Sequence, residues 1–283
     1  MALFRRARLP ATETFQHGER RIAFRDFGAG PRVVVLAHGL LMDSRMFTAL
    51  APALAARGNR VIAIDMFGHG DSDQPHLMTE YSMTQFGHDV IALLEHLGVR
   101  EAVIGGTSLG ANVALEVAVA APQRVRALVL EMPVLEKGLA AAAAFFVPLA
   151  LALRVSQRSM GRVAALARLI PRTHFVADIL IDFLRRDPGA SLAVLDGLTF
   201  GRIAPPIEQR RRIDKPALVI GHPADPIHPF GDADTTSREL KHARLLKAKS
   251  IYEWRLSPAR LTAALADFLD EVWLEDETPS VVH

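Results

Sequence analysis

The sequence predicts an α/β fold with a mostly parallel central sheet, helices on both faces and an inserted helical segment. Short apolar, β-branched runs alternate with helix-length segments through residues 1–131, which is typical of parallel strands joined by crossover helices. Residues 133–213 then carry Ala, Leu and Arg at helical spacing without a convincing strand, and the strand signal returns in PALVIG after Lys215. We therefore expect a core made of residues 1–132 and 214–283, interrupted by a helical cap at residues 133–213.

The elements of this core are expected in a regular order along the chain. Residues 14–27 alternate around a His-Gly pair and predict an N-terminal hairpin. The expected inner strands are residues 33–37, 61–64, 102–105, 127–130, 216–221 and 245–248. The expected helices are residues 45–56, 84–97, 109–120, 233–241 and 258–273. His242 is expected at the end of the helix before the last strand.

Composition excludes several classes of protein. The 33 Lys and Arg residues nearly balance the 31 Asp and Glu residues, leaving a net charge of +2, which is too small to favour nucleic acid or acidic lipid as the main partner. The basic cluster at residues 210–212 is expected on the solvated surface. The absence of cysteine excludes disulfides and thiolate catalysis and makes the cytoplasm the expected location.

The most apolar stretch of the chain lies inside the expected cap. Residues 139–153 read LAAAAAFFVPLALAL, which is shorter than the roughly 20 residues that span a bilayer. Pro148 also interrupts the stretch. We predict a buried or pocket-lining helix, and docking on a membrane surface is the alternative.

The motif that carries the chemistry is GGTSLGAN at residues 105–112. Gly106, Ser108 and Gly110 satisfy G-x-S-x-G between an expected strand and an expected helix, the context that gives this motif its meaning. A nucleophile on a sharp strand-to-helix turn needs neighbours without a Cβ, because the turn is strained and tightly packed. Ser108 is therefore the candidate nucleophile.

Three segments in order resemble the α/β-hydrolase fold family: His38-Gly39 after the first inner strand, DMFGHGDSD at residues 65–73, and the serine turn. The resemblance covers almost the whole chain, and the expected cap lies where that family carries one. It implies that the backbone amides of Leu40 and Leu109 bind the developing oxyanion. It also implies that His38 is a loop residue, although His38 stays an alternative base. Family members with an Asp nucleophile, such as epoxide hydrolases, differ because serine occupies the turn here.

The resemblance also implies an acid, and the preferred candidate is Asp225 in the loop DPIHP. Such a carboxylate orients an imidazole and stabilises its protonated form. Glu131, at the end of an earlier strand, is the alternative acid because some relatives keep their acid there.

The catalytic histidine of the family is missing from its usual place after the last strand, where this chain has Ser250, Ile251 and Tyr252. A serine hydroxyl without a base is a poor nucleophile at neutral pH. His228, three residues beyond Asp225, is the preferred substitute, and His222 is a further alternative base. A metal site formed by these two histidines and Asp225 is a weak third possibility, because no other feature supports it.

These residues predict a serine hydrolase that cleaves a carboxylic ester of an apolar acyl group through an acyl-enzyme. The expected partner is a small apolar or acyl-type molecule, because the expected cap is rich in Ala, Leu and Phe. No cofactor and no metal is expected, since phosphate-binding and dinucleotide-binding glycine motifs are absent. The alternative is a catalytically impaired or non-hydrolytic member of the family, either a ligand-binding protein or a lyase or cyclase. The phenylalanines expected to line an apolar pocket are Phe145, Phe146, Phe175, Phe183 and Phe200.

Overall fold

An eight-stranded sheet forms the centre of the protein in a computed structural model, which describes residues 9–170, 181–182, 184–250 and 253–274. The strand order is β1-β2-β4-β3-β5-β6-β7-β8. Strands β1 and β2 form the antiparallel hairpin, β2 pairs antiparallel with β4, and all later pairs are parallel. The strands are β1 (Glu13–His17), β2 (Arg20–Phe27), β3 (Val33–Ala37), β4 (Arg60–Asp65), β5 (Ala102–Thr107), β6 (Val125–Glu131), β7 (Pro216–Gly221) and β8 (His242–Lys247).

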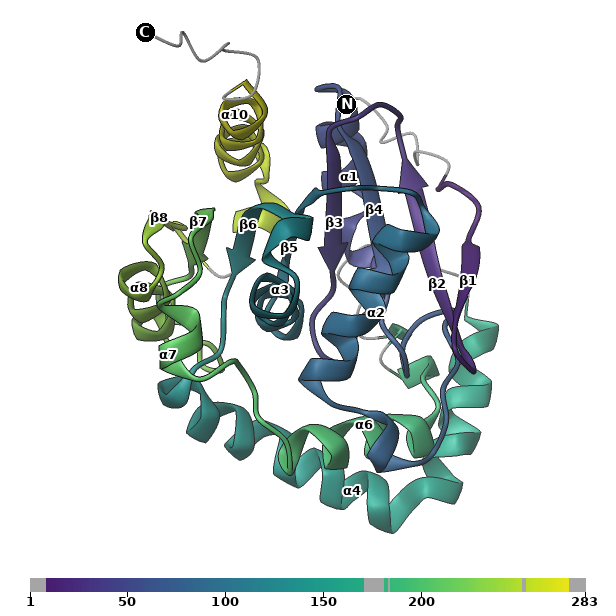
Figure 1. The fold of residues 1–283 in the computed structure, drawn as a ribbon. Coiled ribbons are helices and arrows are strands. Elements are labelled where there is room, and N and C mark those ends of the chain that lie inside the picture. Colours follow the sequence, from purple (N-terminus) through teal and green to yellow (C-terminus); the bar gives the residue numbers. More distant parts are fainter. Residues whose placement is uncertain (1–8, 171–180, 183, 251–252, 275–283) are drawn as a thin grey trace, which may run out of the picture.

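Helices cover both faces of this sheet (Figure 1). One hydrophobic cluster joins the strands to α2 (Met83–His96), α3 (Leu109–Ala120) and α8 (Phe230–Glu239). A second cluster on the other face joins them to α1 (Leu50–Ala55) and α10 (Ala259–Leu274). The predicted mostly parallel sheet with helices on both faces is thereby confirmed. Short helical turns complete the core: η1 (Ser44–Phe47), η2 (Met78–Glu80), η3 (Pro122–Arg124) and α9 (Glu253–Leu256).

The described residues between β6 and β7 form helices and no strand. These helices include α4 (Glu136–Leu169), α6 (Pro188–Thr199) and α7 (Ile207–Arg210). Helices α4 and α6 lie side by side along one edge of the molecule, away from α10 (Figure 1). Asp232 of α8 holds the start of α4, because its buried carboxylate accepts hydrogen bonds from the amides of Leu135 and Gly138.

The expectation that residues 139–153 form a buried or pocket-lining helix is wrong for most of their surface, although Leu153 is buried. These residues belong to a longer helix, and the most apolar 18-residue window within Glu136–Ser156 has a mean hydropathy of 2.0 and is only 11% buried. Judged by length and composition alone, one helix among the described residues could cross a membrane, and it is this one. Hydropathy records which residues are apolar and not what covers them, so the sequence did not distinguish a core helix from an exposed one.

The phenylalanines expected to line a pocket have different positions. Phe145 and Phe200 are exposed, so the expectation is wrong for both. Phe146 is half-buried and packs on a small cluster around Leu41 and Leu153. The other two, Phe175 and Phe183, lie outside the described residues.

Two further expectations are wrong at the polar edge of the core. His242 begins β8 and does not end the preceding helix, and its side chain forms an exposed pair with Asp214. The expectation of a solvated basic cluster at residues 210–212 is wrong for Arg210 alone, which is 3% exposed, whereas Arg211 and Arg212 are exposed. The Arg210 guanidinium donates hydrogen bonds to the Glu239 carboxylate and thereby ties α7 to α8. A buried cation needs such a partner to offset its lost hydration.

Candidate active site

Ser108 lies on a strained turn between β5 and α3. Its φ of 55° and ψ of −112° place a residue with a Cβ in a region that L-amino acids rarely occupy. The Ser108 amide donates a hydrogen bond to the Glu131 carbonyl oxygen at 2.8 Å, which holds the turn against the end of β6. The side chain therefore lies at the carboxyl edge of the sheet and at the N-terminus of α3, where the helix dipole favours negative charge.

The two flanking glycines are required by close backbone contacts. A Cβ on Gly106 would lie 2.3 Å from the Ala37 carbonyl oxygen, and one on Gly110 would lie 1.9 Å from the same oxygen. Real Cβ atoms do not approach a backbone oxygen so closely, because the atoms would overlap. The G-x-S-x-G pattern thus allows the turn to pack directly on the end of β3.

Ser108, His228 and Asp225 form a continuous chain of hydrogen bonds. His228 Nε2 lies 2.8 Å from Ser108 Oγ, and His228 Nδ1 lies 3.0 Å from Asp225 Oδ2. The other oxygen of Asp225 accepts hydrogen bonds from the backbone amides of Ile227 and His228, at 2.8 and 2.9 Å. Asp225 thereby fixes both the turn and the imidazole that the turn carries.

The charge of Asp225 determines which nitrogen of His228 carries the proton. Burial opposes this charge, but hydrogen bonds from the His228 side chain and from the amides of His228 and Ile227 outweigh it, so the pKa of Asp225 lies below its ordinary value. An ionised carboxylate only accepts hydrogen bonds, so Nδ1 is the protonated nitrogen. His228 Nε2 is then left with a lone pair that accepts the hydroxyl proton of Ser108.

The alternative acid and one alternative base pair with each other. Glu131 Oε1 lies 3.1 Å from His222 Nε2, and both side chains are buried. The Thr107 hydroxyl also donates a hydrogen bond to Glu131 Oε2, and the Ser250 carbonyl oxygen lies 3.0 Å from His222 Nδ1. The structure brings neither Glu131 nor His222 into hydrogen-bond contact with Ser108 Oγ.

The other alternative base, His38, has both ring nitrogens engaged, one by the loop after β3 and one by the residue that follows β4. Its Nδ1 lies 2.8 Å from the Gly39 carbonyl oxygen, and its Nε2 accepts a hydrogen bond from the Met66 amide. His69 is held in the same manner, with Nε2 accepting from the Leu41 amide and Nδ1 beside the Phe67 carbonyl oxygen. The two histidines therefore fix the loop that carries Gly39, Leu40 and Leu41.

The expected oxyanion amides lie on segments adjacent to Ser108. Gly39 lies beside the turn, since a Cβ there would be 4.0 Å from the Ser108 Cβ, and Leu40 follows it. Leu109 is the first residue of α3. No residue in the described ranges accepts a hydrogen bond from either the Leu40 or the Leu109 amide. Both donors are thus available for an incoming oxygen.

The buried histidines make stability depend on pH. Burial lowers the pKa of His38 from 6.5 to about 4, and burial also lowers the pKa of His69 well below its ordinary value. The unfolded chain takes up these protons near the ordinary pKa and the folded chain does not, so stability falls as the pH drops from about 6.5 towards 4. One pKa unit corresponds to about 1.4 kcal/mol, so His38 alone is expected to lower the free energy of unfolding by about 3 kcal/mol across this pH window.

Urea unfolding at neutral and mildly acidic pH measures this effect. In His38→Gln, the amide oxygen replaces Nε2 as an acceptor without titrating, and the loss of unfolding free energy on acidification is expected to shrink. If the unfolding free energy of His38→Gln depended on pH exactly as that of the wild type does, the role given to His38 would be contradicted.

The sequence analysis did not single out Arg186, which lies two residues before α6. Its guanidinium donates hydrogen bonds to the carbonyl oxygens of Met42 and Gly68, at 3.1 and 2.9 Å. Burial lowers its pKa to about 10. Only the Asp187-Pro188 helix start was a usable signal, and it does not indicate what the preceding side chain contacts. Arg186 links the helical insertion to the loop after β3.

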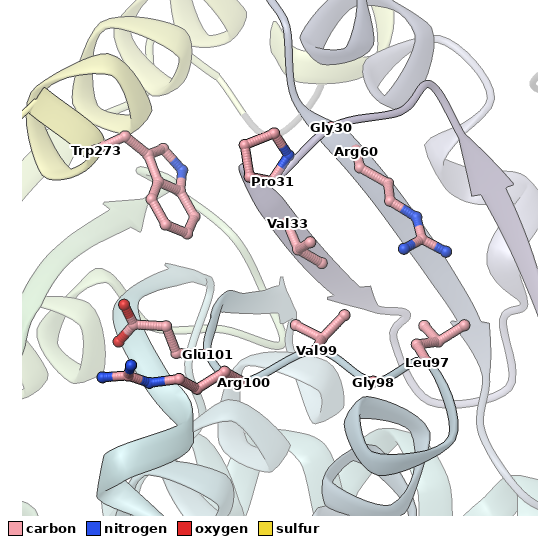
Figure 2. A pocket seen from close by; sticks show the side chains of 10 residues that line it. All are labelled: Gly30, Pro31, Val33, Arg60, Leu97, Gly98, Val99, Arg100, Glu101 and Trp273. Atoms are coloured by element: carbon pink, nitrogen blue, oxygen red, sulfur yellow. The ribbon is translucent and has the colours of Figure 1, made fainter.

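A surface cavity of about 430 Å³ lies elsewhere (Figure 2). It is lined by residues that precede β3 and β5, such as Pro31 and Arg100, together with Trp273 of α10. These positions are at the amino ends of the strands, whereas Ser108 follows the carboxyl end of β5, so this cavity is separate from the candidate site. Within the described ranges, His, Asp and Glu residues form no group of three that could hold a metal ion.

Comparison with known proteins identifies the family. Residues 32–188, more than half of the chain, match the family described as alpha/beta hydrolase fold. The chain belongs to the α/β-hydrolase fold family. Among solved structures, this α/β hydrolase is similar to a hydrolase from Pseudomonas aeruginosa (TM-score 0.74, 24% identity, covering 91% of this chain and 98% of that one). It is also similar to an enol-lactonase from Burkholderia xenovorans (TM-score 0.74, 21% identity, covering 91% of this chain and 100% of that one). At these identities the likeness shows the fold.

Curated relatives match this α/β hydrolase over shorter stretches. It is 37% identical over 108 residues to bifunctional epoxide hydrolase 2 of Sus scrofa, covering 38% of this chain and 19% of the relative. It is 38% identical over 122 residues to the dihydrolipoyllysine-residue acetyltransferase component of an acetoin cleaving system from Pseudomonas putida, covering 43% of this chain and 32% of the relative. The matches thus span a third or less of these two relatives.

Proposed function

We propose that this protein is a serine hydrolase that cleaves carboxylic esters of apolar acyl groups. The observation that carries the proposal is the chain of two hydrogen bonds from Ser108 Oγ through His228 to Asp225. This arrangement supplies an activated nucleophile, a base at hydrogen-bond distance and an acid that orients the base.

In the proposed acylation step, Ser108 Oγ attacks the ester carbonyl carbon while His228 Nε2 takes the hydroxyl proton. The amides of Leu40 and Leu109 donate hydrogen bonds to the carbonyl oxygen as it becomes negative. Loss of one such donor costs roughly 10²-fold to 10³-fold in rate. The tetrahedral intermediate then collapses, the alcohol leaves with the proton from His228, and an acyl-enzyme remains on Ser108.

In the proposed deacylation step, His228 takes a proton from water, and the resulting hydroxide attacks the acyl carbon. The proton returns to Ser108 Oγ as the carboxylic acid leaves. Throughout both steps Asp225 stays ionised and stabilises the imidazolium that forms twice. The lowered pKa of Asp225 suits this role.

The surroundings of the loop after β3 support an apolar acyl group. Leu41 packs in a cluster with Leu153 of α4 and with Leu192 and Leu195 of α6, and Leu40 lies against the same cluster. Apolar walls beside an oxyanion site favour aliphatic groups over charged metabolites. Solved relatives that are named esterases, from Thermogutta terrifontis and Exiguobacterium antarcticum, agree with this class of reaction.

Labelling with a fluorophosphonate probe tests the proposal. The wild type is expected to become covalently labelled, because such probes react with activated serines, and Ser108→Ala is expected to lose all labelling. Ser237→Ala, which removes a hydroxyl in α8 that only donates to the Asp234 carbonyl oxygen, is the matched control and should label fully. A folded wild type that does not label would refute the hydrolase proposal and favour a ligand-binding or non-hydrolytic protein.

A further inference from the structure

The outer face of α4 is an uncovered apolar surface. Five apolar residues recur at intervals of four along one ridge of the helix, and all of them are exposed: Leu139, Ala143, Val147, Leu151 and Val155. The parallel ridge one position further on is also exposed and apolar: Ala140, Ala144, Pro148 and Ala152. Contiguous apolar surfaces of this kind on proteins mark contact sites for proteins or membranes. We call these nine residues the α4 outer face.

Basic residues continue this helix beyond the α4 outer face. Between Lys137 and Leu169 the helix has no acidic residue and carries Arg154, Arg162 and Arg168, of which Arg154 forms an ion pair with Asp196 of α6. Arg162 and Arg168 are exposed. A helix that combines an exposed apolar face with exposed arginines is suited to the boundary of an anionic bilayer, where apolar side chains enter the interface and arginines meet phosphates.

The opposite side of α4 is fixed to the protein. Leu153 is buried in the cluster with Leu41 and Leu192, and Asp232 holds the amides at the helix start. The backbone is non-helical at Ser156, where an apolar first half meets the basic second half. The helix therefore presents one side outwards while it stays packed on α6 with the other, which suits contact along a surface and not insertion across it.

We propose that the α4 outer face docks on the surface of an anionic lipid bilayer. The positive charge decides between a bilayer and a second copy of this chain. Two copies with parallel α4 helices would bring arginines of like charge together, whereas an anionic leaflet neutralises them. The expected cytoplasmic location agrees with this partner, because cytoplasmic leaflets carry anionic lipid. The proposal does not depend on ester hydrolysis, since it concerns binding alone.

Sedimentation of the intact protein with lipid vesicles tests the proposal. We expect binding to vesicles of phosphatidylcholine mixed with phosphatidylglycerol, weaker binding to phosphatidylcholine alone, and weakening by high salt. Leu151→Asp combined with Val155→Asp is expected to reduce binding by at least about tenfold, because charged residues do not enter the interface. Arg162→Glu is expected to reduce binding to the anionic vesicles selectively.

The matched control is Leu274→Asp in α10, at the opposite end of the molecule (Figure 1). Its side chain is 51% exposed, close to the 55% of Leu151, and this variant should bind like the wild type. Circular dichroism and thermal unfolding check that the variants are folded; should the double variant fail to fold, Arg162→Glu alone decides. Failure of the wild type to bind either vesicle would overturn the proposal. So would equal binding by the folded α4 variants, or a wild-type dimer that the double variant dissociates, since a second copy would then cover the face.

Discussion

Replacing His228 by alanine is expected to lower kcat/KM for an ester substrate by about 10³-fold or more, because Ser108 would lose the group that accepts its proton. This expected loss follows from the position of the His228 ring beside the Ser108 hydroxyl. His228 Nε2 is 2.8 Å from Ser108 Oγ, whereas His38 and His222 have both ring nitrogens engaged elsewhere. Steady-state hydrolysis of a chromogenic ester measures the effect, and free imidazole should restore part of the activity by occupying the vacated space.

The chain offers a close control for this substitution. His242 and Asp214 also form an imidazole–carboxylate pair, at 2.8 Å, but on the exposed edge formed by β8. His242→Ala removes the same chemical group and should leave kcat/KM unchanged. Activity that survived in His228→Ala at the wild-type level would show that another group accepts the proton.

Replacing Gly110 by alanine is expected to be strongly destabilising. The added Cβ would lie 1.9 Å from the Ala37 carbonyl oxygen and 2.9 Å from that of His38. Both obstacles are backbone atoms at the end of a buried strand, so they yield less readily than the tip of a side chain. Overpacking costs about 1–3 kcal/mol in adaptable cores, and we expect about 3 kcal/mol or more here, a large part of the roughly 5–15 kcal/mol that stabilises a typical domain.

Gly161→Ala is the control for Gly110→Ala. Gly161 also lies in a helix, but no atom stands within 4 Å of its added Cβ. Alanine is favoured over glycine inside a helix by about 1 kcal/mol, so this variant should be slightly more stable than the wild type. Urea unfolding of the three proteins measures both changes. A Gly110→Ala midpoint equal to that of the wild type would show that the turn can move away from β3.

The sequence predicted best where local pattern and tertiary environment agree. Helix α3 begins at Leu109 and ends at Ala120, as expected, because the serine turn sets its start. The expected strands β3, β5 and β7 are buried throughout or nearly so, which is why continuous apolar runs marked them. Strand β8 is largely exposed and its sequence, HARLLK, lacks a regular alternation, so the sequence does not predict that the strand begins at His242.

Prediction of the candidate site depended on topology as well as motif. Strands β5 and β7 both flank β6 and run parallel, so the loops that follow them meet at one edge of the sheet. Because these two loops meet, a histidine that closely follows Asp225 can reach Ser108. The contacts of Arg186 and the pairing of Glu131 with His222 join residues distant in sequence through side chains, and no local pattern records them.

The loop between β7 and α8 carries the proposed acid and the proposed base within one turn, in which Asp225 also binds the amides of Ile227 and His228. Family members that place their histidine after the last strand must align three separate backbone segments for one proton transfer. Here only two segments have to keep their relative position, the serine turn and this loop. On this proposal, the acid and the base of the site both precede β8, and no catalytic group is assigned to the residues that follow it.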